Sequence, residues 1–150
     1  MIRTATQPTT VSPPAPAFDV ADGVLGLRTL LVNLYFIADP AGEWILVDTG
    51  MPFSTQLILS TAEKRFGPTS RPNAIVLTHG HFDHTGAVKE LAELWDVPVY
   101  VHEMEMPYVT GRSAYPPPDP TVGGGLMARC AYLYPRGPID LHRRHDLHRG

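Results

Sequence analysis

The stretch "LTHGHFDHTG", residues 77–86, decides how the rest of the chain is interpreted. It places His79, His81, Asp83 and His84 within six positions, although the whole chain has only seven histidines. Imidazole nitrogens and carboxylate oxygens are ligands that Zn²⁺ accepts. Isolated histidines usually belong to solvated surface loops, but three of them beside a carboxylate indicate a metal site.

The spacing within the motif favours two neighbouring metal ions. In an extended segment, residues two apart face the same way, so His79 and His81 can aim at one ion. Gly80 between them has no side chain that would obstruct this arrangement. After the following turn, Asp83 and His84 can address a second ion. Metal pairs in two-metal hydrolases lie about 3.5 to 4 Å apart.

The segments on either side of the motif predict a buried strand before it and a helix after it. "NAIVLTH", residues 73–79, is apolar without alternation, which is typical of a strand buried on both faces. Another such strand is predicted at residues 97–102. Between the two, a helix opens at Gly86 and carries its apolar residues on one side, namely Val88, Leu91, Ala92 and Trp95.

Upstream, the sequence predicts a β-hairpin and a further helix. Residues 25–38 and 43–48 are β-rich runs, and the Pro and Gly of residues 39–42 predict the turn between them. Ser54 is placed to cap a helix that ends at Gly67. The order of strand, helix, strand, motif, helix and strand implies an α/β fold with crossover helices. Active groups of such sheets gather at the carboxyl ends of strands, where the motif lies.

Length and composition favour one ordinary globular domain. The chain has 150 residues, and its net charge of -3 gives no electrostatic case for binding nucleic acid. No stretch reaches the roughly 18 to 20 apolar residues that span a membrane, and the amino terminus lacks the apolar region of a signal peptide. We therefore expect a cytoplasmic protein that binds a small-molecule substrate but neither nucleic acid nor membrane. The single cysteine, Cys130, is expected to be a buried, inert thiol.

The two ends of the chain differ from the middle. Residues 1–17 are rich in Pro, Thr and Ala and predict a disordered leader, so the domain is expected to span residues 18–141. Residues 142–150, "HRRHDLHRG", predict a solvated tail that is basic and rich in histidine. A short helix is predicted at residues 103–109. The Pro- and Gly-rich residues 111–125 are expected to form a loop that covers a substrate.

Two segments of the chain resemble the metallo-β-lactamase fold superfamily. "THGHFDH", residues 78–84, matches its His-x-His-x-Asp-His signature, and "WILVDTG", residues 44–50, is similar to its strand that ends in an aspartate. The resemblance covers residues 23–105 and is closest to glyoxalase II-like and lactonase-like hydrolases. It implies an αββα sandwich, of which residues 18–141 would supply the first half, a mixed sheet with helices on one side.

The resemblance also implies a role for each polar residue of the site. His79 and His81 would bind the first metal ion, and Asp83 and His84 the second. Asp83 would also be catalytic, because it would orient the attacking water. Asp48 would accept hydrogen bonds from groups near the ligands and so support them. The implied cofactor is a pair of Zn²⁺ ions, with iron or manganese as alternatives, and the implied reaction is hydrolysis of a small ester, thioester or lactone by a metal-bound hydroxide.

The sequence departs from the family pattern after the motif. The family completes its two sites with a third histidine, a bridging aspartate and a further histidine, all well downstream. His102 is expected to cap the end of a strand instead. The other late candidates stand in no family-like context and are Asp140, His142, His145, Asp146 and His148. We therefore expect an amino-terminal part of a larger hydrolase that, as this chain, holds metal weakly, hydrolyses little and self-associates through its exposed sheet.

Two other functions stay open on the sequence alone. The first is a non-catalytic metal-binding half-domain that assembles with a partner supplying the remaining ligands. The second is a redox member of the same superfamily with a di-iron site, because iron and zinc accept overlapping ligands. Metal analysis together with capture of a partner would separate both alternatives from the hydrolase.

Overall fold

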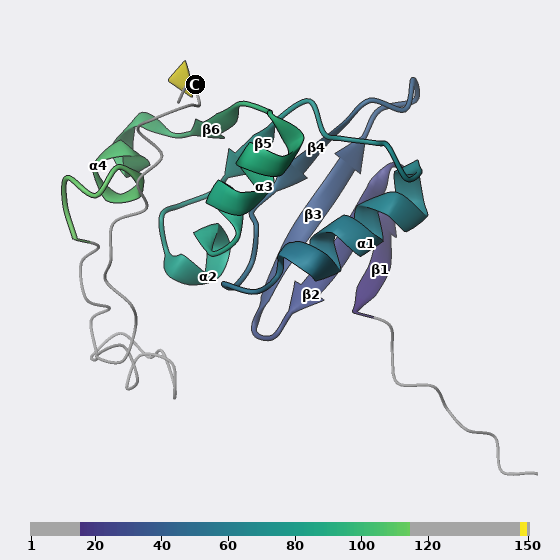
Figure 1. The fold of residues 1–150 in the computed structure, drawn as a ribbon, viewed down its shortest axis with the longest axis horizontal. Helices are drawn as coiled ribbons and strands as arrows, with labels where there is room; N and C mark the ends of the chain where they lie inside the picture. The colour runs from purple at the N-terminus through teal and green to yellow at the C-terminus, as the bar shows by residue number, and fades with distance from the viewer. Residues whose placement is uncertain (1–15, 115–147, 150) are drawn as a thin grey trace, which may run out of the picture.

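The computed structural model describes residues 16–114 and 148–149 (Figure 1). The strands of these residues form one mixed sheet, in which they follow one another in sequence order. The first four strands pair antiparallel, and β4 through β7 pair parallel. The strands are β1 (Ala17–Ala21), β2 (Val24–Thr29), β3 (Val32–Ala38), β4 (Trp44–Val47), β5 (Ile75–Leu77), β6 (Val99–Val101) and β7 (His148–Arg149).

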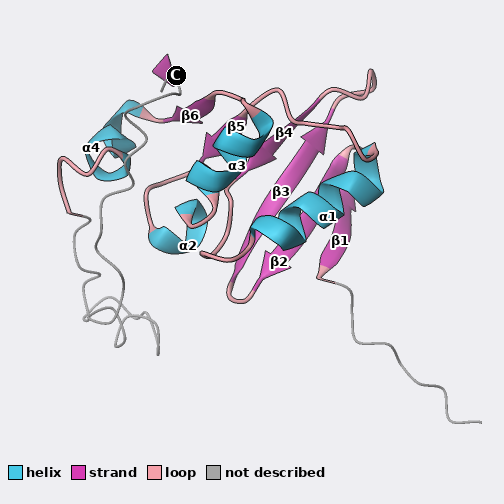
Figure 2. Ribbon diagram, in the orientation of Figure 1, coloured by secondary structure: helices cyan, strands magenta, loops and turns pink. Residues whose placement is uncertain are grey.

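Helices join the parallel strands and cover one face of the sheet. α1 (Thr55–Phe66) connects β4 to β5, and α3 (Val88–Trp95) lies between β5 and β6. Figure 2 shows both helices in cyan in front of the magenta strands. The predicted mixed sheet with helices on one side is therefore confirmed. Among the residues that the structure describes, no helix has the length and apolar character needed to cross a membrane.

The helix boundaries largely follow the sequence signals. Ser54 stands at the N-cap of α1, although its hydroxyl makes no capping hydrogen bond, and Gly67 ends the helix with a φ of 102° that glycine adopts readily. The predicted short helix at residues 103–109 is present as η1 (Glu103–Glu105) and α4 (Met106–Val109). α2 (Phe82–Thr85) lies inside the motif, where the sequence predicted only a turn.

The hydrophobic core lies between the sheet and the two longer helices. The Trp44 ring stacks on Phe66 with ring centroids 4.5 Å apart and meets Trp95 edge-on at 5.8 Å. These contacts hold the carboxyl-terminal ends of α1 and α3 against the start of β4. α3 buries the side predicted from the sequence, namely Val88, Leu91, Ala92 and Trp95. The sheet contributes Leu27, Leu34, Phe36, Trp44, Leu46, Ile75, Leu77, Val99 and Val101.

The prediction of one strand over residues 25–38 is wrong, because the run folds into two strands, β2 and β3. They are joined by a turn at Leu30 and Leu31. Leu30 has a φ of 58°, at the position where a type II′ hairpin turn normally has glycine. Neither leucine is a typical turn residue, so the sequence pattern did not predict this turn. The next turn lies where predicted, and the Asp39 carboxylate accepts the Ala41 N–H at 2.9 Å.

Replacing Leu30 by glycine is expected to stabilise the fold by about 0.5 to 1 kcal/mol, because a left-handed conformation is strained for leucine and free for glycine. Its side chain is 77 % exposed, so little packing is lost. Leu31→Gly is the matched control. Leu31 is 64 % exposed without a positive φ, and its replacement should destabilise by a similar amount. Urea unfolding of both variants measures the two shifts, and equal shifts of the same sign would contradict the argument.

The two predicted terminal segments are only partly described. β1 begins at Ala17, the last residue of the predicted leader, whereas residues 1–15 lie outside the described range. In the predicted tail, β7 pairs with β6 so that His148 lies opposite Tyr100, a strand that the sequence did not predict. The predicted domain boundaries and the disorder of the leader stay predictions.

The sheet face away from the helices is also apolar. Tyr35 lies beside Val47 on this face, and Ile37 lies beside Ile45. Phe18 and Ile37 are each 39 % exposed. Exposed apolar faces of this kind often mark contacts between proteins. The predicted self-association through this face stays a prediction.

Candidate metal centre

The motif lies at the carboxyl edge of the sheet, as predicted. It follows β5 directly, and Asp48 follows β4 directly. Because β4 and β5 are parallel neighbours, with Val47 opposite Val76, both segments leave the sheet at the same edge. This topology brings two segments 30 residues apart into contact.

The Asp48 carboxylate makes three of the polar contacts at this edge. Its carboxylate is buried, and Oδ1 accepts the Thr78 N–H at 2.8 Å. Its Oδ2 accepts the Thr78 hydroxyl at 2.7 Å and lies 2.8 Å from His84 Nδ1. Asp48 has a φ of 61°, a left-handed conformation that aspartate tolerates better than most residues. The predicted contact between Asp48 and the motif loop is confirmed, while Thr78 is a partner that the sequence did not single out.

The three imidazoles of the motif gather on one side of this edge. The ring centroids of His79 and His81 are 4.7 Å apart, and those of His79 and His84 are 4.1 Å apart. His79 Nδ1 lies 3.0 Å from the Thr78 hydroxyl oxygen. Asp83 lies on α2, between His81 and His84 in the chain. The predicted convergence is therefore present for the three imidazoles, and that of Asp83 stays a prediction.

Backbone hydrogen bonds hold the motif in this shape. The His81 carbonyl accepts the N–H groups of His84 and Thr85, both at 3.0 Å, and so starts α2. The His84 carbonyl accepts the Thr49 N–H at 2.7 Å and the Thr49 hydroxyl at 3.0 Å. Gly86 N–H donates to the Gly50 carbonyl at 2.9 Å. The loop after β4 and the loop after β5 thus form one connected unit.

The surroundings divide the histidines into two kinds. Burial lowers the pKa of His79, and the neighbouring His84 and His81 lower it further. Burial also lowers the pKa of His81. The hydrogen bond to Asp48 raises the pKa of His84 against the effect of burial. His79 and His81 therefore favour the neutral imidazole, which is the form that binds metals.

The donor chemistry of the site fits a divalent metal ion. Three imidazoles and a carboxylate lie together, and one imidazole uses Nδ1 for a buried aspartate, as metal-binding histidines commonly do. Within residues 16–114 and 148–149, however, no three His, Cys, Asp or Glu side chains are placed so that they could hold an ion together. The donor types match the prediction, and the ligand roles of His79, His81, Asp83 and His84 stay predictions.

The later ligand candidates do not add to this cluster in the described part of the chain. His102 is exposed, and its Nδ1 accepts the Met104 N–H at 3.2 Å, so it caps η1 after β6 as expected. His148 is described only through the backbone pairing of β7. The remaining candidates, together with Cys130 and most of the predicted covering loop, lie within residues 115–147, outside the described residues; these candidates are Asp140, His142, His145 and Asp146.

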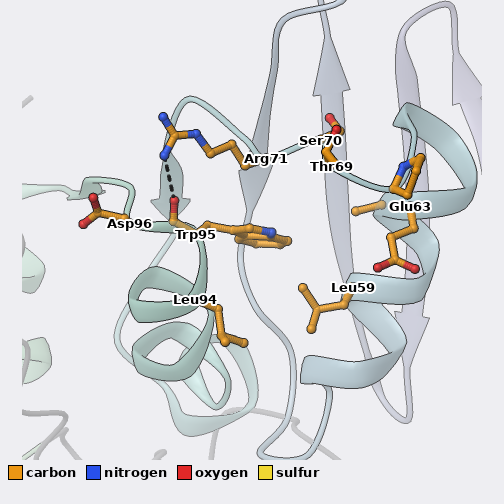
Figure 3. A pocket seen from close by; sticks show the side chains of 10 residues that line it. Leu59, Glu63, Thr69, Ser70, Arg71, Leu94, Trp95 and Asp96 are labelled. Carbon is orange, nitrogen blue, oxygen red and sulfur yellow. Dashed lines mark hydrogen bonds between the residues drawn. The ribbon is translucent and has the colours of Figure 1, made fainter.

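A separate hollow of about 330 Å³ lies at the opposite edge of the sheet (Figure 3). Trp95 and Arg71 line it, and the Arg71 guanidinium donates to the Trp95 carbonyl at 3.2 Å. Leu59 and Leu94 stand across from each other where α1 and α3 face the hollow. Arg71 precedes β5, whereas the motif follows it, so the hollow is not part of the histidine site.

Comparison with known proteins adds three findings. The family model described as the metallo-beta-lactamase superfamily matches residues 27–150. The probable metallo-hydrolase YflN of Bacillus subtilis is 49 % identical over 126 residues, which are 83 % of this chain and 48 % of that protein. The solved structure of BJP-1, a subclass B3 metallo-beta-lactamase of Bradyrhizobium japonicum, matches with a TM-score of 0.59 and 28 % identity over 73 % of this chain and 40 % of that one.

A more distant relative shows the same partial overlap. The probable metallo-hydrolase YybB of Bacillus subtilis is 35 % identical over 85 residues, which are 57 % of this chain and 36 % of that protein. The chain therefore spans about half or less of the length of these curated relatives.

Proposed function

Since this chain belongs to the metallo-β-lactamase superfamily, we propose that it carries the metal-binding motif of a hydrolase acting on a small ester, thioester or lactone. The resemblance predicted from the sequence is confirmed by the family match. Two curated relatives are named probable metallo-hydrolases, which supports a metal-dependent hydrolase. The identity of the metal and the substrate class belong to the proposal.

The contact between Asp48 and His84 carries the proposal. The Asp48 carboxylate engages His84 Nδ1, which leaves Nε2 as the ring nitrogen able to bind a metal ion. Buried carboxylates paired with a histidine in this way orient the ring and raise its basicity as a ligand. A site built only to stabilise the fold would not need two further imidazoles beside this pair.

The proposed ligand assignment follows the motif. His79 and His81 would hold one Zn²⁺ ion, and Asp83 and His84 a second, after rotations of these half-buried side chains. Bound zinc supplies Lewis-acid chemistry, polarising a carbonyl group and lowering the pKa of water. Asp83 would orient that water, and Asp48 with Thr78 would keep His84 in place.

Three exposed apolar side chains support a substrate with an apolar acyl part. Leu30 and Leu31 form the β2–β3 turn, at the edge where β4 ends, and Phe53 is 98 % exposed in the loop after Asp48. Gly50 in this loop lies against the side chains of Thr29 and Ser54, so the turn and the loop adjoin each other and the motif. An apolar acyl group at the histidine cluster would find these side chains within reach.

We expect this chain to hydrolyse its substrate slowly. Catalytic zinc sites use three protein ligands and a water molecule. The described motif offers two histidines to one ion, and one carboxylate and one histidine to the other, so each site is one ligand short among the described residues. We therefore expect weak zinc binding and slow, zinc-dependent turnover.

A zinc titration and a turnover assay with small thioesters and lactones test the proposal on the purified chain. We expect His79→Ala to weaken zinc binding and turnover by about tenfold or more, because it removes a ligand. His102→Ala should change neither, since that imidazole caps η1. Turnover that is independent of zinc, or equal in His79→Ala, would contradict the proposal. Zinc binding without any turnover would favour the half-domain, and redox-active iron would favour the di-iron alternative.

A further inference from the structure

A glutamate from a distant segment reaches the backbone of the motif. Glu105, in η1, accepts the Gly80 N–H through its Oε2 at 2.9 Å. Gly80 is the residue between His79 and His81, so this bond acts on the short piece of chain that directs both imidazoles. The acceptor comes from outside positions 77–86, from the segment after β6.

The segment that carries Glu105 packs closely on Gly80. A Cβ added to Gly80 would lie 3.1 Å from Tyr108 Cβ and 3.3 Å from Val109 Cγ1, which is tighter than most real contacts. Glycine is therefore what allows η1 and α4 to approach the motif. The missing Cβ of Gly80 therefore leaves room for α4 as well as between His79 and His81.

The same segment is anchored firmly enough to serve as a support. Val109 is completely buried in the core, and the Glu105 N–H donates to the His102 carbonyl at 2.9 Å. Thr110 donates to the Met106 carbonyl through both its N–H and its hydroxyl. A carboxylate held on such a segment keeps a fixed position relative to the sheet edge.

The geometry points to Glu105 as a positioning residue of the metal centre, which acts through Gly80 to fix the direction in which His79 and His81 present their imidazoles. This inference rests on the proposed function. The inference depends on the length of the Glu105 side chain and not on its charge. What matters is an oxygen acceptor at the distance of the glutamate carboxylate. A structural role alone would show in the stability of the fold and not in the affinity or the coordination of a metal ion.

Two conservative variants separate reach from charge. Glu105→Gln keeps an oxygen acceptor at the same distance and loses the charge, whereas Glu105→Asp keeps the charge and shortens the side chain. Both are titrated with Co²⁺ in the full chain, with the visible absorption spectrum of the bound ion as the readout. We expect Glu105→Gln to stay within a few-fold of the unaltered chain, and Glu105→Asp to bind Co²⁺ about 10 to 100-fold more weakly with a changed spectrum. Glu103→Ala, exposed in the same η1, is the control and should bind Co²⁺ like the unaltered chain.

The outcomes distinguish this inference from the proposed function. If the unaltered chain binds Co²⁺ and Glu105→Asp binds it equally well with the same spectrum, the positioning role is wrong and the proposed function stands. If Glu105→Gln loses affinity as Glu105→Asp does, an oxygen acceptor at the distance of the glutamate carboxylate is not sufficient without the charge, and the inference fails. If the unaltered chain binds no metal, both the inference and the proposed function fail. Thermal unfolding without metal shows that each variant is folded.

Discussion

Gly86→Ala is expected to destabilise the fold by about 3 kcal/mol or more and to remove metal binding with it. A Cβ at Gly86 would overlap the backbone of Met51 and Pro52, which cannot rotate away as a side chain can. The loop after β4 and the loop after β5 would have to separate. This would break the bonds from Thr49 to the His84 carbonyl and from Gly86 to Gly50.

The comparison with Gly80→Ala makes this prediction specific. A Cβ at Gly80 would meet side-chain atoms of α4 at 3.1 Å, and a shift of a few tenths of an ångström relieves that contact. We expect Gly80→Ala to fold with a loss of about 1 kcal/mol, and Gly86→Ala to unfold in much lower urea concentrations. Both glycines lie outside the left-handed region, so backbone strain does not enter the comparison. Equal urea midpoints for the two variants would show that the two loops separate easily.

The sequence predicted those elements whose signals are local. The helical spacing of Val88, Leu91 and Trp95 predicted the buried side of α3, and the apolar run before the motif predicted β5. The β2–β3 turn was missed because Leu30 and Leu31 carry no turn signal and take their shape from the pairing of the flanking strands. Tertiary pairing here overrides what the residues prefer locally.

In the candidate site, too, the residues with a local sequence signal were predicted and those that act through distant contacts were not. The histidine cluster is contiguous in sequence, so its spacing alone indicated convergence. The role of Asp48 followed only from a resemblance, since an aspartate at the end of a strand is common in turns. Glu105 was not predicted, because a contact between a side chain and a backbone N–H 25 residues away leaves no pattern in the sequence. Thr78 was hidden for a similar reason, since its hydroxyl matters only through Asp48.

Asp48→Ala is expected to cost about 3 kcal/mol of stability and to weaken metal binding about 100-fold. The change removes the acceptor for the Thr78 N–H, the Thr78 hydroxyl and His84 Nδ1, all at a position that is only 4 % exposed. Unsatisfied buried donors cost about 1 to 3 kcal/mol each, although such losses are not additive. Alanine also fits the left-handed backbone at this position less well than aspartate does.

Asp48→Asn separates the effect on metal binding from the effect on stability. The asparagine oxygen can still accept the Thr78 N–H, so the loss of stability should stay near 1 kcal/mol. Its amide group would, however, donate toward His84 Nδ1, which would then have to be the acceptor. The ring proton would move to Nε2, and that nitrogen could no longer bind a metal ion. Asp48→Asn should therefore lose about 10 to 100-fold in Co²⁺ affinity while its urea midpoint changes little.

The control for Asp48→Asn is Asp39→Asn. Asp39 is an exposed aspartate whose carboxylate also accepts backbone N–H groups, from Ala41 and Glu43, but it lies in the β3–β4 turn, at the opposite end of β4 from the motif. Asp39→Asn should leave the Co²⁺ affinity unchanged. If Asp48→Asn bound Co²⁺ as tightly as the unaltered chain, His84 would not need Asp48 to set its tautomer. The carboxylate would then serve the fold alone, and the observation that carries the proposed function would be lost.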